Sequence, residues 1–305
     1  MHDAVADFHS TNLGGILPGV KTPAMDLLEG VIDYAGLYPP AKLPLAEAVA
    51  EYQSILKGEG AWLTSRFVCP AADRDAVQSA FGGEEVFLTL VGSGDFAADA
   101  DALLKEGPAV ATGYEARLPA GGDELLSSLA RIKKLVKKVE GEVDVYAELP
   151  WSEDLIESMH EVASVEGVGF KARTGGVTAD AFPSTGQLAA FITEVVALEA
   201  PFKFTAGLHE PIRYRDESLG VMRHGFINVL VASALALTHD FSTSEVQALL
   251  EITDAAEFAL GDGAIQVKGH ALSLPEIAEL REMFGGFGSC SVAEPLDGLK
   301  RIGWV

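Results

Sequence analysis

Strand-like and helix-like segments alternate along almost the whole of this 305-residue chain. The first pair is an apolar run at 30–37 and a helical pattern that begins near Pro44, and the seventh is an apolar run at 201–208 and a helical pattern over 216–237. Alternation of this kind indicates a parallel sheet with helices packed against it.

The eighth pair is less regular. A second helical pattern over 242–260 is followed by a short apolar run at 264–269, a helical pattern over 272–284 and the glycine-rich segment 286–292. We predict that 286–292 is the eighth strand, that 297–303 is a short closing helix, and that 264–269 belongs to an inserted hairpin. The chain is therefore expected to fold as a single α/β domain over residues 1–305, a (β/α)8 TIM barrel with a short N-terminal lead-in and an insertion before the eighth strand. An open doubly wound sheet is the alternative, but no GxGxxG sequence lies between the first strand and its helix.

The acidic composition limits the possible partners. The chain has 45 acidic and 22 basic residues, which disfavours nucleic acid and anionic membrane as partners. The N-terminal sequence MHDAVADFHS lacks the basic and apolar regions of a signal peptide, and the longest apolar run, FINVLVASALAL, is too short to span a bilayer. We expect a cytoplasmic protein that binds a small anionic molecule, and a homo-oligomer is possible.

Two lysines interrupt apolar strand-like runs. Lys171 lies in GVGFKARTGG and Lys203 in PFKFTAGLHEP, about one strand–helix unit apart. Lysine is rarely fully buried without a partner or a function. Two desolvated cations held near each other favour a neutral, nucleophilic amine. We therefore expect Lys171 to attack a substrate carbonyl, with Lys203 and Arg173 as the neighbouring cations.

Polar residues end almost every predicted strand, where the active sites of barrel enzymes lie. Residues two apart share a side of a strand, so Glu115 with Arg117 and Tyr146 with Glu148 are expected to point the same way. Glu148 or Glu115 is expected to move protons, and the arginines suit a carboxylate or a phosphate. The predicted substrate-binding residues are Arg66, Arg117, Arg173, Arg213, Thr205, His209, Asp33, Tyr38, Ser289 and Ser291.

Three features have two interpretations each. Cys290 is either a nucleophile at a strand end or a small buried thiol that fills the barrel. His209 is either a general acid or base or a histidine bonded to backbone. Asp33, Glu115 and Glu148 suit a magnesium or manganese ion, but their spacing is not diagnostic, so we predict no cofactor and keep a divalent metal as the alternative.

The two lysine segments resemble the class I aldolases of the deoxyribose-phosphate aldolase type. FKARTGGVTADAF and FKFTAGLHEPIR carry the resemblance, and SRFVCPA and FLTLVGSG are looser matches. The similarity extends over residues 61–213. The resemblance implies a TIM-barrel lyase in which Lys171 forms the Schiff base and Lys203 lowers the pKa of Lys171. The family's catalytic aspartate on the fourth strand has no clear counterpart, and Glu115 is the nearest carboxylate. The segments DYAGLYPPA and FGSCSVAEPLDGL are foreign to that family and, with KFTAGLHEPIR, resemble a bacterial family without an assigned activity.

Three functions follow from these features. The first is a Schiff-base aldolase or lyase that acts on an anionic carbonyl compound. The second keeps the anionic ligand without an imine, as in a phosphosugar isomerase, a phosphoribosyl-type transferase or a metal-assisted lyase, with the lysines as charge clamps. The third is a non-catalytic ligand-binding barrel.

Overall fold

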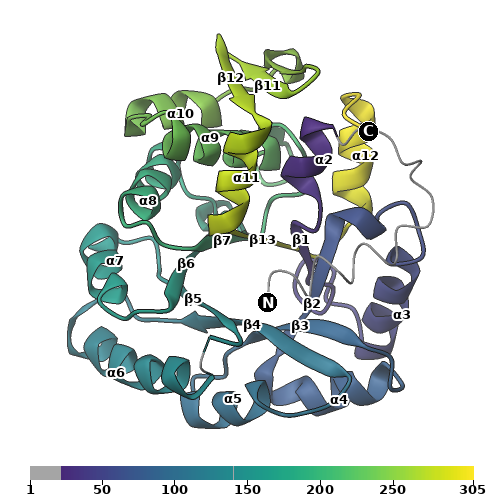
Figure 1. The fold of residues 1–305 in the computed structure, drawn as a ribbon, viewed down its shortest axis with the longest axis vertical. Coiled ribbons are helices and arrows are strands. Elements are labelled where there is room, and N and C mark those ends of the chain that lie inside the picture. Colours follow the sequence, from purple (N-terminus) through teal and green to yellow (C-terminus); the bar gives the residue numbers. More distant parts are fainter. Residues whose placement is uncertain (1–21, 140) are drawn as a thin grey trace.

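A closed barrel of eight parallel strands forms the centre of the molecule, as the sequence predicts (Figure 1). The structure is a computed structural model that describes residues 22–139 and 141–305, so the predicted N-terminal lead-in falls largely outside the described residues. Around the barrel the strands follow the order β1-β13-β7-β6-β5-β4-β3-β2. The strands are β1 (Ile32–Tyr34), β2 (Thr64–Pro70), β3 (Val86–Val91), β4 (Ala109–Arg117), β5 (Asp144–Glu148), β6 (Val168–Arg173), β7 (Phe202–Thr205) and β13 (Phe284–Ser289).

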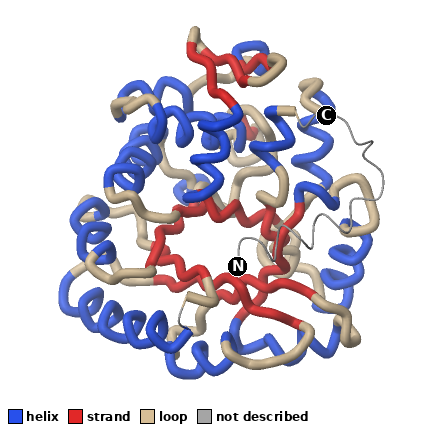
Figure 2. Tube along the Cα trace, in the orientation of Figure 1, coloured by secondary structure: helices blue, strands red, loops and turns tan. Residues whose placement is uncertain are grey.

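Helices surround this ring of strands (Figure 2). A helix follows each barrel strand, and α2, α10 and α11 are additional. No helix within the described ranges is long and apolar enough to cross a membrane. The helices are α2 (Pro23–Leu28), α3 (Leu45–Ile55), α4 (Arg74–Ala80), α5 (Phe96–Leu103), α6 (Gly122–Val139), α7 (Leu155–Ala163), α8 (Thr185–Ala197), α9 (Phe226–Thr238), α10 (Thr243–Leu250), α11 (Leu274–Met283) and α12 (Ala293–Arg301).

Two predicted helices are shorter than the sequence pattern indicates. The helix predicted over 216–237 begins only with α9, because a hairpin of β8 (Tyr214–Asp216) and β9 (Val221–Arg223) precedes it. The Asp216 side chain accepts hydrogen bonds from the backbone of the hairpin turn, and Gly220 has the positive φ of +69° that the turn requires.

The predicted helix over 242–260 ends with α10, and its last residues form β10 (Phe258–Leu260). This strand pairs with β11 (Ala264–Val267), which pairs with β12 (His270–Ser273). The predicted hairpin is therefore present as β11 and β12, and β10 extends it into a three-stranded antiparallel sheet. It lies at the outer edge of the molecule, at the top of Figure 1. The closing helix α12 also begins earlier than predicted.

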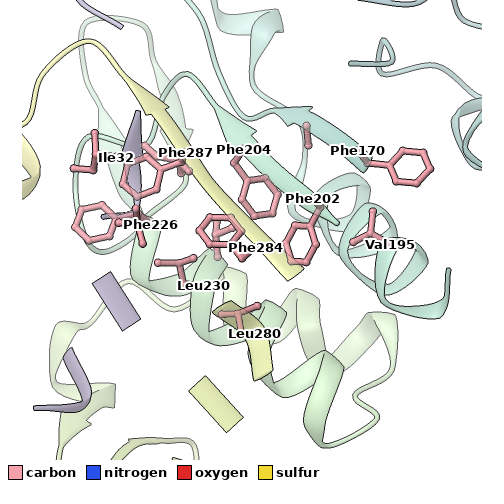
Figure 3. Packing of buried hydrophobic residues seen from close by; sticks show 14 of the residues in the cluster. Ile32, Phe170, Val195, Phe202, Phe204, Phe226, Leu230, Leu280, Phe284 and Phe287 are labelled. Atoms are coloured by element: carbon pink, nitrogen blue, oxygen red, sulfur yellow. The ribbon is translucent and has the colours of Figure 1, made fainter. Parts of the chain in front are cut away.

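Phenylalanines on one side of the barrel strands pack under the helices and fix which residues face the barrel interior. Phe202 and Phe204 of β7 lie against Phe284 of β13, with ring centroids 5.6 and 5.8 Å apart, and Leu230 of α9 lies beside them (Figure 3). Burying each such side chain contributes about 1.5–3 kcal/mol. Because side chains alternate along a strand, this packing turns Lys203 into the barrel.

Candidate active site

The two lysines and three carboxylates form one ion network inside the barrel. The Nζ atom of Lys203 lies 2.6 Å from Asp33 Oδ2 and 2.8 Å from Glu115 Oε1. The Nζ atom of Lys171 lies 2.5 Å from Glu115 Oε2 and 2.6 Å from Glu148 Oε2. The contact with Glu148 is an ion pair without good hydrogen-bond alignment. Glu115 therefore bridges the two lysines that the sequence singles out.

Burial and charge act in opposite directions on this network. Burial alone would raise the pKa of Glu115, but the ammonium groups of Lys171 and Lys203 outweigh it and hold the pKa at about 2. Lys203 is fully buried, which by itself would lower its pKa, yet Asp33 and Glu115 raise the pKa above its usual value. Lys203 is therefore a cation and Glu115 an anion at neutral pH.

Arg66 and Tyr146 lie in the barrel interior beside the network. The guanidinium of Arg66 lies 2.7 Å from Asp144 at the start of β5, and Arg66 does not line the cavity described below. The Tyr146 ring lies 5.5 Å from the Lys203 ammonium in a cation–π contact. Gly285 leaves room for this ring, because a Cβ atom there would stand 2.0 Å from the Tyr146 hydroxyl.

A cavity of about 210 Å³ opens at the carboxyl ends of the strands. It is smaller than the roughly 300–1,000 Å³ of pockets for drug-sized ligands, so it suits a small molecule. Lys171 and Glu115 lie at its base. The predicted binding residues that line it are Tyr38, Arg117, Arg173, Thr205 and His209.

The other predicted residues lie outside this cavity. Glu148 contacts Lys171 and Lys203 contacts Glu115, so both adjoin a residue that lines the cavity, whereas Asp33 contacts Lys203. Arg213 lies beside the buried His224, with 3.5 Å between Nη1 and Nδ1. The Ser289 hydroxyl donates to the Ser291 carbonyl, and the Ser291 hydroxyl accepts from the Glu294 backbone, so both serines hold the turn before α12.

Three arginines place positive charge around the cavity. Arg117 lies 3.4 Å from Glu148, and Arg223 lies 3.1 Å from Asp216. Arg173 makes no ion pair within the described residues, and its backbone carbonyl accepts a hydrogen bond from Trp151. Sequence reasoning missed Arg223, because the segment that carries it was predicted to be helical.

The remaining lining groups differ in protonation. Burial raises the pKa of the Tyr38 hydroxyl, which is buried without a hydrogen-bond partner among the described residues. Burial also raises the pKa of Cys290, so its thiol is protonated and the interpretation as a buried filler fits better than that as a nucleophile. His209 pairs with Glu294, which sequence reasoning missed.

The carboxylates considered for a metal are each paired with a lysine. Asp33 contacts Lys203, Glu148 contacts Lys171, and Glu115 contacts both. In the part of the chain that the structure describes, no group of three or more histidine, cysteine, aspartate or glutamate residues is arranged to hold a metal ion.

The geometry thus combines one amine in contact with two carboxylates, a small cavity above it, and guanidinium groups around that cavity. Such a set can bind an anion and transfer protons beside a nucleophile. Comparisons of the chain with models of protein families, with curated proteins and with solved structures found no match.

Proposed function

We propose that the protein is a class I aldolase or lyase that forms an imine between Lys171 and a small anionic carbonyl compound. The observation that carries the proposal is the position of the Lys171 amine, at the base of the cavity and within 2.6 Å of two carboxylates. A lysine that acts as a nucleophile needs a proton acceptor within hydrogen-bond reach and an open path to the substrate. Lys171 has both, whereas Lys203 has no access to the cavity.

The two carboxylates have different roles in this reaction. Glu115 stays ionised because it is shared with Lys203. Glu148 contacts Lys171 and the arginine at the mouth, Arg117, so we assign to Glu148 the proton that Lys171 must release before attack. The freed amine forms a bond to the carbonyl carbon, Glu148 returns the proton to the carbonyl oxygen, and loss of water leaves a protonated imine.

The ion network suits the charge of this product. An ammonium group and a carbonyl give a protonated imine and water, so the Lys171 nitrogen carries one positive charge both before and after the reaction. Glu115 and Glu148 therefore face a cation both before and after the reaction, without reorganisation of the site. Lys203 keeps Glu115 ionised during the step in which Lys171 is neutral.

The anionic end of the substrate is assigned to the arginines. Arg173 lines the cavity without an ion pair among the described residues, so its donors are available to a carboxylate or a phosphate. The small cavity favours a substrate of few atoms. The resemblance to deoxyribose-phosphate aldolases also supports the proposal, because Glu115, the carboxylate nearest to that family's catalytic aspartate, lies on the fourth strand and contacts both lysines.

Borohydride reduction tests the imine directly. The wild-type protein is incubated with pyruvate or with dihydroxyacetone phosphate, reduced, and analysed by peptide mass spectrometry. We expect a stable adduct on Lys171 that is lost in Lys171→Met and retained in Lys138→Met, which alters an exposed lysine of α6. An absence of adduct in the wild type, or an equal amount of adduct in Lys171→Met, would refute the proposal.

A second reaction class uses the same contacts without an imine. An ammonium group between two carboxylates can also serve as a fixed charge that binds a phosphate, as in an isomerase or a transferase of phosphosugars. Turnover of a phosphosugar without any reducible adduct would favour this class. Ligand stabilisation without turnover would instead favour a binding protein.

A further inference from the structure

A histidine–carboxylate pair stands beside the cavity on the other side of Lys171 from Glu115 and Glu148. In the barrel order, β4 and β5 supply the two carboxylates on one side of β6. His209 follows β7 and Glu294 lies in the first turn of α12 after β13, on the other side of β6. The pair therefore approaches a ligand on Lys171 from a different direction.

The contact between His209 and Glu294 determines which nitrogen of the imidazole carries the hydrogen. His209 Nδ1 lies 2.6 Å from Glu294 Oε2, so the carboxylate accepts the Nδ1 hydrogen. The neutral ring then carries its lone pair on Nε2, which has no hydrogen-bond partner among the described residues. His209 is buried and lines the cavity. An oriented imidazole with a free Nε2 at a ligand cavity has the geometry of a general base.

We infer that His209, positioned by Glu294, transfers the proton at the substrate carbon next to the imine carbon. This inference rests on the proposed function. Glu115 and Glu148 contact the Lys171 nitrogen, which places them for the nitrogen and oxygen protons of imine formation. The carbon proton needs a separate acceptor, and His209 is an imidazole that follows β7 and lines the cavity.

The step balances as a proton transfer without any further reactant. His209 Nε2 takes the proton, the electron pair of the broken C–H bond forms a carbon–carbon double bond, and the imine π electrons become the lone pair of the nitrogen. The product is an enamine and an imidazolium, whose charge Glu294 offsets. The reverse step returns a proton, or a deuteron in heavy water, to the carbon.

The charged neighbours of His209 determine its pH dependence. Glu294 and Glu210 raise the pKa of His209, while burial, the largest effect, and Arg223 lower it, so the pKa lies below its ordinary value. Lys171 and Arg173 face the same cavity. The imidazole is therefore neutral and able to accept a proton at neutral pH.

Two measurements on the same variants test the role of the pair. Each protein is incubated with pyruvate or dihydroxyacetone phosphate, and the borohydride adduct on Lys171 is measured beside the rate of deuterium incorporation from heavy water by NMR. In His209→Gln we expect the adduct to persist and the exchange rate to fall by about 10²-fold or more. Asp297→Asn, an exposed carboxylate on the same helix as Glu294, is expected to leave both readouts unchanged.

Glu294→Gln separates positioning from simple loss of structure. Glu294 raises the pKa of His209, so in Glu294→Gln the fall of the exchange rate on acidification is expected to occur at lower pH. The loss of exchange rate at neutral pH is expected to be smaller than in His209→Gln. An adduct with undiminished exchange in His209→Gln would overturn the inference alone. No adduct in the wild type would overturn the inference and the proposed function together.

Discussion

Replacing Lys203 by methionine is expected to destabilise the barrel by about 3 kcal/mol or more. Methionine keeps a similar length but has no charge and no hydrogen-bond donor. Lys203 is fully buried, so water cannot replace the lost ammonium. After the change, the hydrogen bond from the Thr89 hydroxyl, at 2.9 Å, remains to Asp33, and the ion pair with Lys171 remains to Glu115.

Two routes lead to this magnitude. Removing one partner from a buried ion pair costs about 3–5 kcal/mol. Separately, the pKa of Glu115 is about 2 instead of the usual 4.5, which corresponds to about 3 kcal/mol of net stabilisation of the carboxylate by the two lysines. Lys203 supplies part of that stabilisation and also pairs with Asp33, so both estimates are of the same order.

A double-mutant cycle with Asp33→Asn measures the interaction itself. Urea unfolding at pH 7, followed by circular dichroism, gives the free energy of unfolding of wild type, Lys203→Met, Asp33→Asn and the double variant. We expect the double variant to lose less than the sum of the single losses, by about 1 kcal/mol or more. Lys138→Met serves as the exposed control.

The same variant changes the response to acid. The low pKa of Glu115 contributes stability that is present above about pH 4.5 and lost as the pH falls toward 2. Without Lys203 the pKa rises, so Lys203→Met should lose less stability across this interval than the wild type. A free energy of unfolding of Lys203→Met within about 0.5 kcal/mol of the wild-type value at pH 7, a change typical of an exposed surface site, would refute this prediction.

Three further predictions concern other parts of the structure. Burial lowers the pKa of His224 to about 4, so the wild type should lose about 3 kcal/mol of stability between pH 6.5 and 4, and His224→Gln should remove this loss in urea titrations at the two pH values. Gly285→Ala should cost about 1–3 kcal/mol because its Cβ would strike the buried tyrosine ring, whereas Gly263→Ala, with open space around it, should change stability by less than about 0.5 kcal/mol. Arg173→Gln should weaken binding of pyruvate about tenfold in calorimetry, and Arg131→Gln on α6 should not.

The barrel and the inward position of the two lysines and Glu115 were predictable because both follow from strand periodicity. Lys203 is preceded and followed by phenylalanines. Their side chains share one face of β7, which packs against the helices, so the lysine must face the barrel interior. The same alternation placed Glu115 and Lys171 in the interior. Residue spacing within single strands was therefore enough to gather the charges at the barrel centre.

Features that depend on longer-range placement were not predictable in this way. Alternation does not give the height of a residue inside the barrel, so Arg66 was expected at the cavity although it pairs with Asp144. The pair of His209 and Glu294 joins residues 85 positions apart, and nothing local to either residue indicates the other. The apolar residues of β9 continue into α9, which hid the hairpin that carries Arg223.

The ion pair between Asp33 and Lys203 has a consequence for the order of folding. It joins residues 170 positions apart, and β13, the last strand of the chain, lies between β1 and β7 in the closed barrel. Contacts this distant in sequence form late, because the entropy of a very long loop must be lost first. The ion pair is therefore expected to form after the transition state of folding. Its removal should accelerate unfolding while the folding rate stays almost unchanged.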